Sequence, residues 1–143
     1  MARKTYSILD EISPSAVSDQ DILSMIAVVR NGLDFSAFMA IAGNSPFTLG
    51  EWSSFLHLSE RTIQRFKKDK KRFDPLQSEK ILQIALLYNH GVEVFGGREK
   101  FDAWLESEQI ALGRMKPKDL LDSNFGIGLL RDEITRIEHG VLA

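Results

Sequence analysis

The middle of the chain carries four polar side chains at helical spacing that could recognise nucleic acid. These are Arg61, Gln64, Arg65 and Lys68. Because successive residues of a helix lie about 100° apart around its axis, the four share one face and leave Ile63 and Phe66 on the other. Bidentate donors on one face of a helix can address base edges and phosphates in a major groove. The chemistry that this stretch predicts is therefore nucleic-acid recognition.

The residues around this face predict two short helices joined by a tight turn. Thr48 and Glu51 have the spacing of a capping box at the start of the first helix, and Ser59 is a good cap for the second. The first helix has one apolar face, made of Leu49, Trp52, Phe55 and Leu56. The positions at which a helix-turn-helix motif needs buried side chains are also apolar: Trp52, Leu56, Leu58, Ile63 and Phe66. His57 stands where such motifs usually have glycine, so we expect either a wider turn or strain at this residue.

Positive charge gathers on and just after the second helix. Residues 61–72 contain seven basic side chains and one acidic side chain, a local balance of +6, whereas the whole chain has a net charge of −2. The remainder therefore carries a charge of −8. This asymmetry is typical of a protein that presents one face to phosphate. The alternatives are a solvated basic helix in an all-α domain, and a small helical adaptor whose basic stripe binds an acidic protein.

Composition excludes several other classes of protein. With 143 residues, 43% of them hydrophobic, the chain is long and apolar enough for one globular domain or two small ones. It has no cysteine, which excludes disulfides, thiolate metal sites and a cysteine nucleophile. The N-terminus lacks the apolar run of a signal peptide, and no segment has the roughly 20 apolar residues of a membrane span. We therefore expect a cytoplasmic protein that does not enter a membrane.

The sequence contains no convincing catalytic or metal-binding constellation. The three histidines, His57, His90 and His139, lack the spacing of a metal site. Residues 126–131 contain two-thirds of a dinucleotide-binding fingerprint, but no strand precedes them and Arg131 replaces the third glycine. We therefore expect no enzyme activity, no metal and no cofactor.

Four regions are predicted along the chain. They are a flexible arm at 1–17, a helix-turn-helix DNA-binding domain at 18–73, a linking helix at 74–97, and a C-terminal module of short helices at 98–143. Inside the DNA-binding domain, helices are expected at about 19–30 and 34–42. These two helices would either pack against the helix-turn-helix pair or form a dimer surface.

The linking helix is predicted to be the longest and to be buried on several sides. Its start and end signals are Asp74, Pro75, Gln77, Gly96 and Gly97. Its apolar residues, from Leu76 to Phe95, lie all round the axis, and this pattern predicts the burial. Gly91 is expected to weaken or bend the helix.

The last helix is predicted over about 126–139. Its apolar stripe is Ile127, Leu130, Ile134 and Ile137. Gly140 ends the helix and leaves an apolar tail at 141–143. The tail either folds back on the module or contacts a partner.

Several sequence landmarks recur in a characteristic order. They are LSERTIQRF at 58–66, EKILQIALLYNHGVEVFGG at 79–97, FDAWLESEQIALG at 101–113, Pro117 with Leu120 and Leu121, and Gly126 followed by RIEHG at 136–140. With these landmarks the chain, from about Leu56 to its C-terminus, resembles the Xre/MbcA/ParS family of type II antitoxins. Two positions depart from the family pattern: Gly91 stands where alanine is commoner, and Lys116 where a capping threonine or serine is usual. These departures concern helix ends rather than membership.

The resemblance implies an all-α antitoxin in two parts. An Xre-like helix-turn-helix half would bind the operator of its own operon as a homodimer, and a C-terminal module would bind a cognate RES-domain toxin. Such toxins consume NAD, and the antitoxin would neutralise one by covering its active site. The DNA-binding candidates are Thr48, Ser59, Arg61, Thr62, Gln64, Arg65, Lys67, Lys68, Lys70 and Lys71. The toxin-binding candidates are Trp104, Leu130, Arg131, Ile134, Glu138, His139, Gly140, Val141, Leu142 and Ala143.

A second hypothesis is a helix-turn-helix transcriptional regulator without a toxin partner. The stretch SERTIQRFKK at 59–68 also resembles the recognition helix of AraC-type regulators. An AraC-type unit needs two such motifs, and this chain has one.

Overall fold

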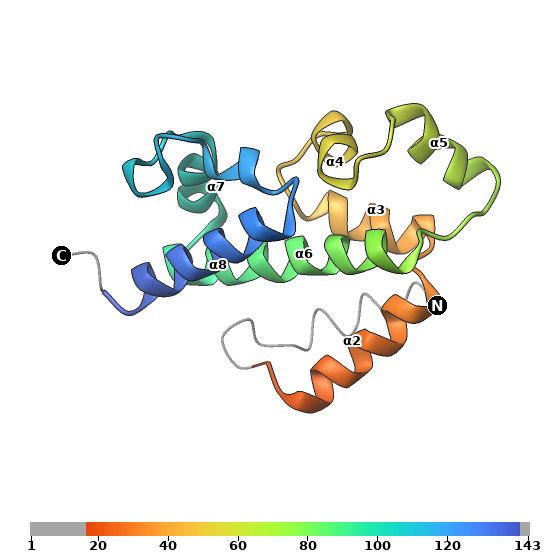
Figure 1. Ribbon diagram of the computed structural model, residues 1–143, viewed down its shortest axis with the longest axis horizontal. Coiled ribbons are helices and arrows are strands. Elements are labelled where there is room, and N and C mark those ends of the chain that lie inside the picture. The colour runs from red at the N-terminus through yellow and green to blue at the C-terminus, as the bar shows by residue number, and fades with distance from the viewer. Residues whose placement is uncertain (1–16, 141–143) are drawn as a thin grey trace. The chain divides into compact units, whose positions relative to one another are not determined.

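The computed structural model describes residues 17–140, and within this range every regular element is a helix (Figure 1). The elements are α2 (Asp19–Asn31), α3 (Phe35–Gly43), α4 (Leu49–Leu56), α5 (Glu60–Lys68), α6 (Pro75–Phe95), α7 (Arg98–Glu106), the 3-10 helices η1 (Ile110–Leu112) and η2 (Pro117–Leu120), and α8 (Asn124–Glu138). The predicted all-α class is confirmed. The expected arm, apart from Val17, and the apolar tail at 141–143 lie outside the described residues.

The chain divides into two compact units, and the division falls inside α6. Unit 1 ends at Ala85 and unit 2 begins at Leu86. Each unit has its own buried side chains, and we describe each by itself.

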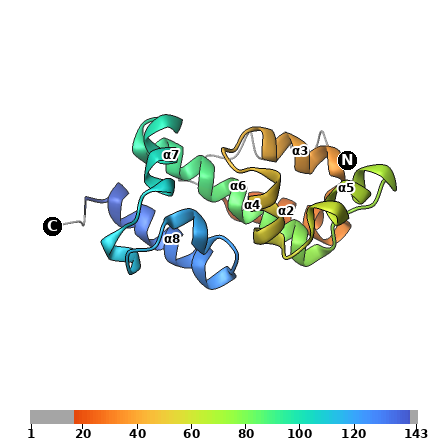
Figure 2. The same cartoon turned by 90° about the horizontal axis from the view of Figure 1, so that it is seen from above.

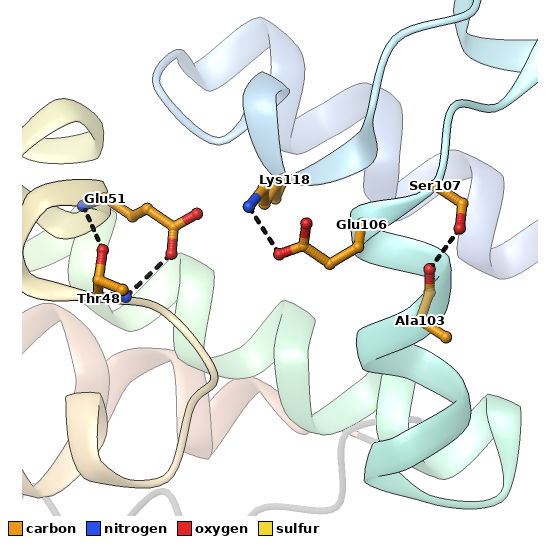
Figure 3. A network of polar contacts seen from close by, with 6 residues as sticks. All are labelled: Thr48, Glu51, Ala103, Glu106, Ser107 and Lys118. Carbon is orange, nitrogen blue, oxygen red and sulfur yellow. Dashed lines mark hydrogen bonds and ion pairs between the residues drawn. The ribbon is translucent and has the colours of Figure 1, made fainter.

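Side-chain caps set the helix starts, as the sequence predicts. In α4 the backbone N–H of Glu51 donates to Thr48 Oγ1 over 3.1 Å, and the N–H of Thr48 donates to Glu51 Oε1 over 3.0 Å (Figure 3). Asp74 and Gln77 form the same reciprocal pair at the start of α6, with distances of 2.7 and 3.1 Å. In α8 the N–H of Gly126 donates to Ser123 Oγ, so this helix begins two residues earlier than predicted.

A cluster of aromatic rings holds unit 1 together. The ring of Phe38 lies 5.3 Å from Trp52 and 5.1 Å from Phe73, measured between ring centroids. Phe47 and Phe55 extend the cluster around Trp52 with edge-to-face contacts. The predicted burial of Trp52 and Phe55 is confirmed.

The apolar residues of α2 contribute little to this core. No residue of α2 is fully buried, and Ile22, Leu23 and Ile26 are exposed. Leu76, in the first turn of α6, is also 79% exposed, so the prediction that its side chain is buried is wrong. Burial in α6 begins with Ser78, and Phe73, just before the helix, is also buried, so Leu76 lies on the solvent side of the first turn.

The segment after α5 is fastened to the loop between α2 and α3. The N–H of Phe73 donates to the Leu33 carbonyl over 2.8 Å, and the N–H of Leu33 donates to Ser78 Oγ over 2.9 Å. Arg72 donates from its guanidinium to the Gly32 carbonyl over 2.8 Å. Gly32 has φ 84°, and a Cβ there would lie 2.5 Å from the Phe73 carbonyl oxygen, so a side chain cannot be accommodated.

Unit 2 packs α7 against the second half of α6. Gly91 makes this possible, because a Cβ at this position would overlap the ring of Phe101. The expectation that Gly91 weakens α6 is therefore incomplete: its small size lets the helix accept the ring, and α6 continues to Phe95. Tyr88 also links the two helices by donating from its hydroxyl to Asp102 Oδ1 over 2.7 Å. Burial, and then this hydrogen bond, raises the pKa of Tyr88 above its ordinary value.

The chain from α7 to α8 runs through two short turns of 3-10 helix, which Figures 1 and 2 let the reader follow. An isolated bridge pairs Gln109 with Met115 and closes the loop that contains η1. Lys118 in η2 forms an ion pair with Glu106 of α7, with 2.6 Å between Nζ and Oε1 (Figure 3). The sequence pattern did not predict η1.

Candidate nucleic-acid interface and partner-binding surface

The turn between α4 and α5 is tight. His57 adopts the left-handed conformation, with φ 56° and ψ 39°. The N–H of Leu58 then donates to the Ser53 carbonyl over 3.1 Å, and the Ser53 hydroxyl donates to the Leu58 carbonyl. The expectation of a wider turn is wrong, because histidine is among the side chains that tolerate this conformation better than most. His57 thus takes the backbone conformation that glycine usually supplies.

The first turn of α5 is ordered by a serine cap. Ser59 Oγ accepts from the N–H of Thr62 over 3.0 Å, and the two hydroxyl oxygens lie 2.8 Å apart. Thr62 is half-buried, whereas Ser59 is exposed. Both side chains lie at the positive end of the helix dipole, where backbone N–H groups attract phosphate. Thr48 occupies the corresponding place at the start of α4.

One face of α5 is turned fully to solvent. Arg61, Gln64, Arg65 and Lys68 are all exposed. Ile63, on the opposite face, is completely buried. Within the described part of the chain these four polar side chains make no hydrogen bond or ion pair. Their donors are therefore available for an external ligand.

The basic residues beyond this face differ in their surroundings. Lys67, Lys70 and Lys71 are exposed, and Lys70 has a positive φ of 52° where the chain leaves the helix. The ammonium of Lys71 lies 5.9 Å from the centre of the Phe66 ring, within cation–π distance. Arg72 is different, because its guanidinium is bound to the Gly32 carbonyl and helps to hold the segment in place. The sequence gives no local sign of this role, since the partner is forty residues away in the chain.

The predicted partner-binding residues of unit 2 fall into three groups. Trp104 is half-buried, with its ring stacked on Phe101 at 5.7 Å and tilted against Phe95 at 5.3 Å. It therefore belongs to an aromatic cluster and exposes only part of its surface.

Leu130 and Ile134 are completely buried, so their assignment to an exposed partner-binding surface is corrected. They share one face of α8 with Gly126 and Ile127. Residues four apart on a helix lie one above the other, and this face is the one that α8 turns to the protein interior.

The exposed group lies along α8 and at its end. Arg131, Glu138, His139 and Gly140 are exposed. Glu138 Oε1 lies 3.1 Å from His90 Nε2, which ties the end of α8 to α6. The remaining candidates, Val141, Leu142 and Ala143, lie outside the described residues.

Two apolar side chains that the sequence analysis did not assign to the partner surface are exposed on α8. They are Phe125, which is 95% exposed, and Leu129, which is 43% exposed. Their four-residue spacing places them on one face of the helix, away from the predicted apolar stripe, and this spacing was the signal in the sequence that could have identified an exposed apolar pair.

Residues 17–140 contain neither a metal-binding cluster nor a helix that could cross a membrane. No group of histidine, aspartate and glutamate side chains in this range is arranged to hold a metal ion. None of the helices described has the length and apolar character needed to cross a bilayer.

Comparison with known proteins matches both halves of the chain to families. Residues 24–86 match the model of the antitoxin Xre-like helix-turn-helix domain, and residues 90–140 match that of the antitoxin Xre/MbcA/ParS C-terminal toxin-binding domain. A protein named antitoxin Xre from Photorhabdus laumondii is 26% identical over 118 residues, which cover 82% of this chain and 80% of the relative. Another antitoxin Xre, from Yersinia enterocolitica, is 31% identical over 87 residues, which cover 60% of this chain and 59% of the relative.

Proposed function

The chain belongs to the Xre family of antitoxins, with a helix-turn-helix domain and a toxin-binding domain, and from this premise we propose that it neutralises a RES-class toxin and represses its own operon. It is not a member of an enzyme family. The observation that carries the proposal is that one chain joins an exposed basic helix face to a domain of the toxin-binding type. A repressor that senses its toxin needs both parts.

The DNA-binding half of the proposal rests on α5. Gln64 and Arg65 would read base edges in the major groove, where arginine pairs well with guanine and glutamine with adenine. Two sets of groups would bind phosphates. The first set is the helix starts at Thr48 and Ser59, together with Thr62. The second set is the basic side chains of Arg61, Lys67, Lys68, Lys70 and Lys71. Each phosphate neutralised would steepen the dependence of log affinity on log salt by about 0.9.

The toxin-binding half of the proposal rests on the exposed end of α8. Arg131 and the residues from Glu138 to Gly140 are exposed and would contact the toxin, together with Val141 to Ala143. We propose that this end covers the active site and so stops the toxin from consuming NAD. Trp104 would contribute only the part of its ring that is not packed on Phe101.

A homodimer fits the expected operator. Two recognition helices about 34 Å apart would read a palindrome from one side of the duplex. The exposed apolar side chains Ile22, Leu23 and Ile26 on α2 are candidates for the contact between copies. Because both the operator and the NAD pool are in the cytoplasm, we propose that the protein acts there.

The proposal is tested by expressing the adjacent reading frame alone and then together with this chain, while cellular NAD is measured. We expect NAD to collapse in the first culture and to be preserved in the second. If the neighbour leaves NAD unchanged, the RES-toxin assignment fails. Salt-dependent, sequence-selective binding to the chain's own promoter would then support the alternative, a regulator without a toxin partner.

A further inference from the structure

An apolar pair is exposed at the start of α8. Phe125 and Leu129 lie four residues apart, so their side chains are neighbours on one face of the helix. The buried face, which includes Ile127 and Leu130, points elsewhere. A phenylalanine that is 95% exposed on a helix leaves almost its whole ring in water.

The first turn of α8 holds this pair rigidly. Ser123 caps the helix through the N–H of Gly126 over 2.9 Å. Gly126 is buried, and a Cβ there would overlap the Leu120 carbonyl, so the helix lies directly on the backbone of η2. Leu121, beside this contact, is completely buried. The backbone at Phe125 is therefore fixed, so binding would order only the side chain.

We infer that Phe125 and Leu129 form an apolar anchor that inserts into a pocket on the toxin, at a distance from the toxin's active site. This inference rests on the proposed function and adds a second contact to it. The surface proposed to cover the toxin's active site comprises Arg131 and residues 138–143, most of it at the end of α8. Phe125 lies near the other end of α8, and a helix of 15 residues is roughly 22 Å long.

Interface size favours two contacts over one. A stable protein–protein interface usually uses about 20–30 residues on each side. The end of the chain from Glu138 onward supplies six residues, and Arg131 and part of Trp104 add two more, which is still too few. Further contact along the exposed face of α8, including Phe125 and Leu129, would bring the interface closer to the usual size.

The surroundings of the pair resemble those of an interface centre. Binding energy concentrates in buried aromatic anchors enclosed by a rim of polar groups. Asp132 and Arg136 follow Leu129 on the same face, at three and seven residues, and both are exposed. Phe125 also lies within residues 90–140, the part that matches a toxin-binding domain, so the toxin is the occupant that we favour over a second copy of this chain.

The test measures the affinity of the full chain for the purified RES-class toxin encoded next to it. Variants Phe125→Ala and Leu129→Ala are compared with Leu76→Ala, which removes an exposed apolar side chain from unit 1. We expect Phe125→Ala to weaken binding at least about 30-fold, Leu129→Ala less, and Leu76→Ala not at all. Unfolding midpoints and operator affinity are measured in parallel, and both should stay at the wild-type value in Phe125→Ala.

The outcomes separate the inference from the proposed function. If the wild-type chain does not bind the toxin, the proposed function fails and the inference falls with it. If the wild-type chain binds and Phe125→Ala binds equally well, only the inference is overturned. Sedimentation without toxin adds one further outcome. If the wild-type chain forms an oligomer that Phe125→Ala dissociates, and the affinity for the toxin is unchanged, this face is a contact between copies and the inference is overturned.

Discussion

Two glycines of α8 should respond to alanine with opposite sign. Gly126 has the Leu120 carbonyl against it, whereas a Cβ at Gly128 would meet nothing within 4 Å. Both lie inside the helix, so the gain in helix propensity, about 1 kcal/mol, is the same for each. The substitutions therefore differ only in what the added methyl group meets.

The cost at Gly126 follows from that contact. Backbone atoms face each other across it, so no side chain can rotate away, and α8 must move off η2 by on the order of an ångström. Overpacking of this kind costs about 1–3 kcal/mol or more, and the displaced helix also loosens the burial of Ile127 and Leu130. We expect Gly126→Ala to destabilise unit 2 by about 2 kcal/mol after the propensity gain is subtracted, and Gly128→Ala to stabilise it by about 0.5–1 kcal/mol.

Urea unfolding of the full chain, followed by circular dichroism at equal protein concentration, measures both changes. A difference of about 3 kcal/mol between the two variants is several times the usual error of such fits. If Gly126→Ala is as stable as wild type or more stable, α8 does not lie on the η2 backbone, and the argument for a rigidly presented Phe125 is refuted. Operator binding should be unchanged in both variants, because the contact belongs to unit 2.

Three further predictions concern the remaining sites. Arg65→Ala should weaken operator binding by about 1–3 kcal/mol with little effect on random DNA, whereas Lys70→Ala should weaken binding to both and reduce the salt slope by about 0.9. Fluorescence anisotropy over a salt series distinguishes the two variants. An equal loss of affinity on all DNA would make Arg65 a phosphate contact. His57→Val should lower the free energy of unfolding by about 1–2 kcal/mol, whereas His57→Gly should change it little, because only glycine adopts a positive φ without steric cost. Equal urea midpoints for the two variants would show that the turn is not constrained. Deletion of residues 141–143 should impair NAD preservation in the co-expression assay but leave operator affinity intact, and full protection by the shortened chain would exclude the tail from neutralisation.

Local signals were enough to predict most of the helices. The caps at Thr48, Ser59 and Asp74 act on backbone groups within three residues, so the sequence contains all that is needed to place them. The exposed face of α5 is likewise implied by the spacing of its residues and by the apolar stripe that contains Ile63.

The sequence could not determine which residues meet across the chain. Gly91 and Gly126 look like helix-weakening residues until Phe101 and the Leu120 carbonyl are placed against them. Arg72 looks like one more basic residue until its guanidinium is found on the Gly32 carbonyl. Each role depends on a contact between segments, and periodicity carries no information about such contacts.

The sequence by itself therefore determined the helical class, the helix-turn-helix pair and the basic face of α5, because these depend on caps, spacing and charge within a few residues. Tertiary structure decided the orientation of α8: Leu130 and Ile134 are buried, and Phe125 and Leu129 are exposed. Apolar residues at helical spacing can lie on a buried face of the helix or on an exposed one, and their spacing is the same in both cases. The packing of Gly126 on η2, together with the burial of Ile127, Leu130 and Ile134, leaves Phe125 and Leu129 in water.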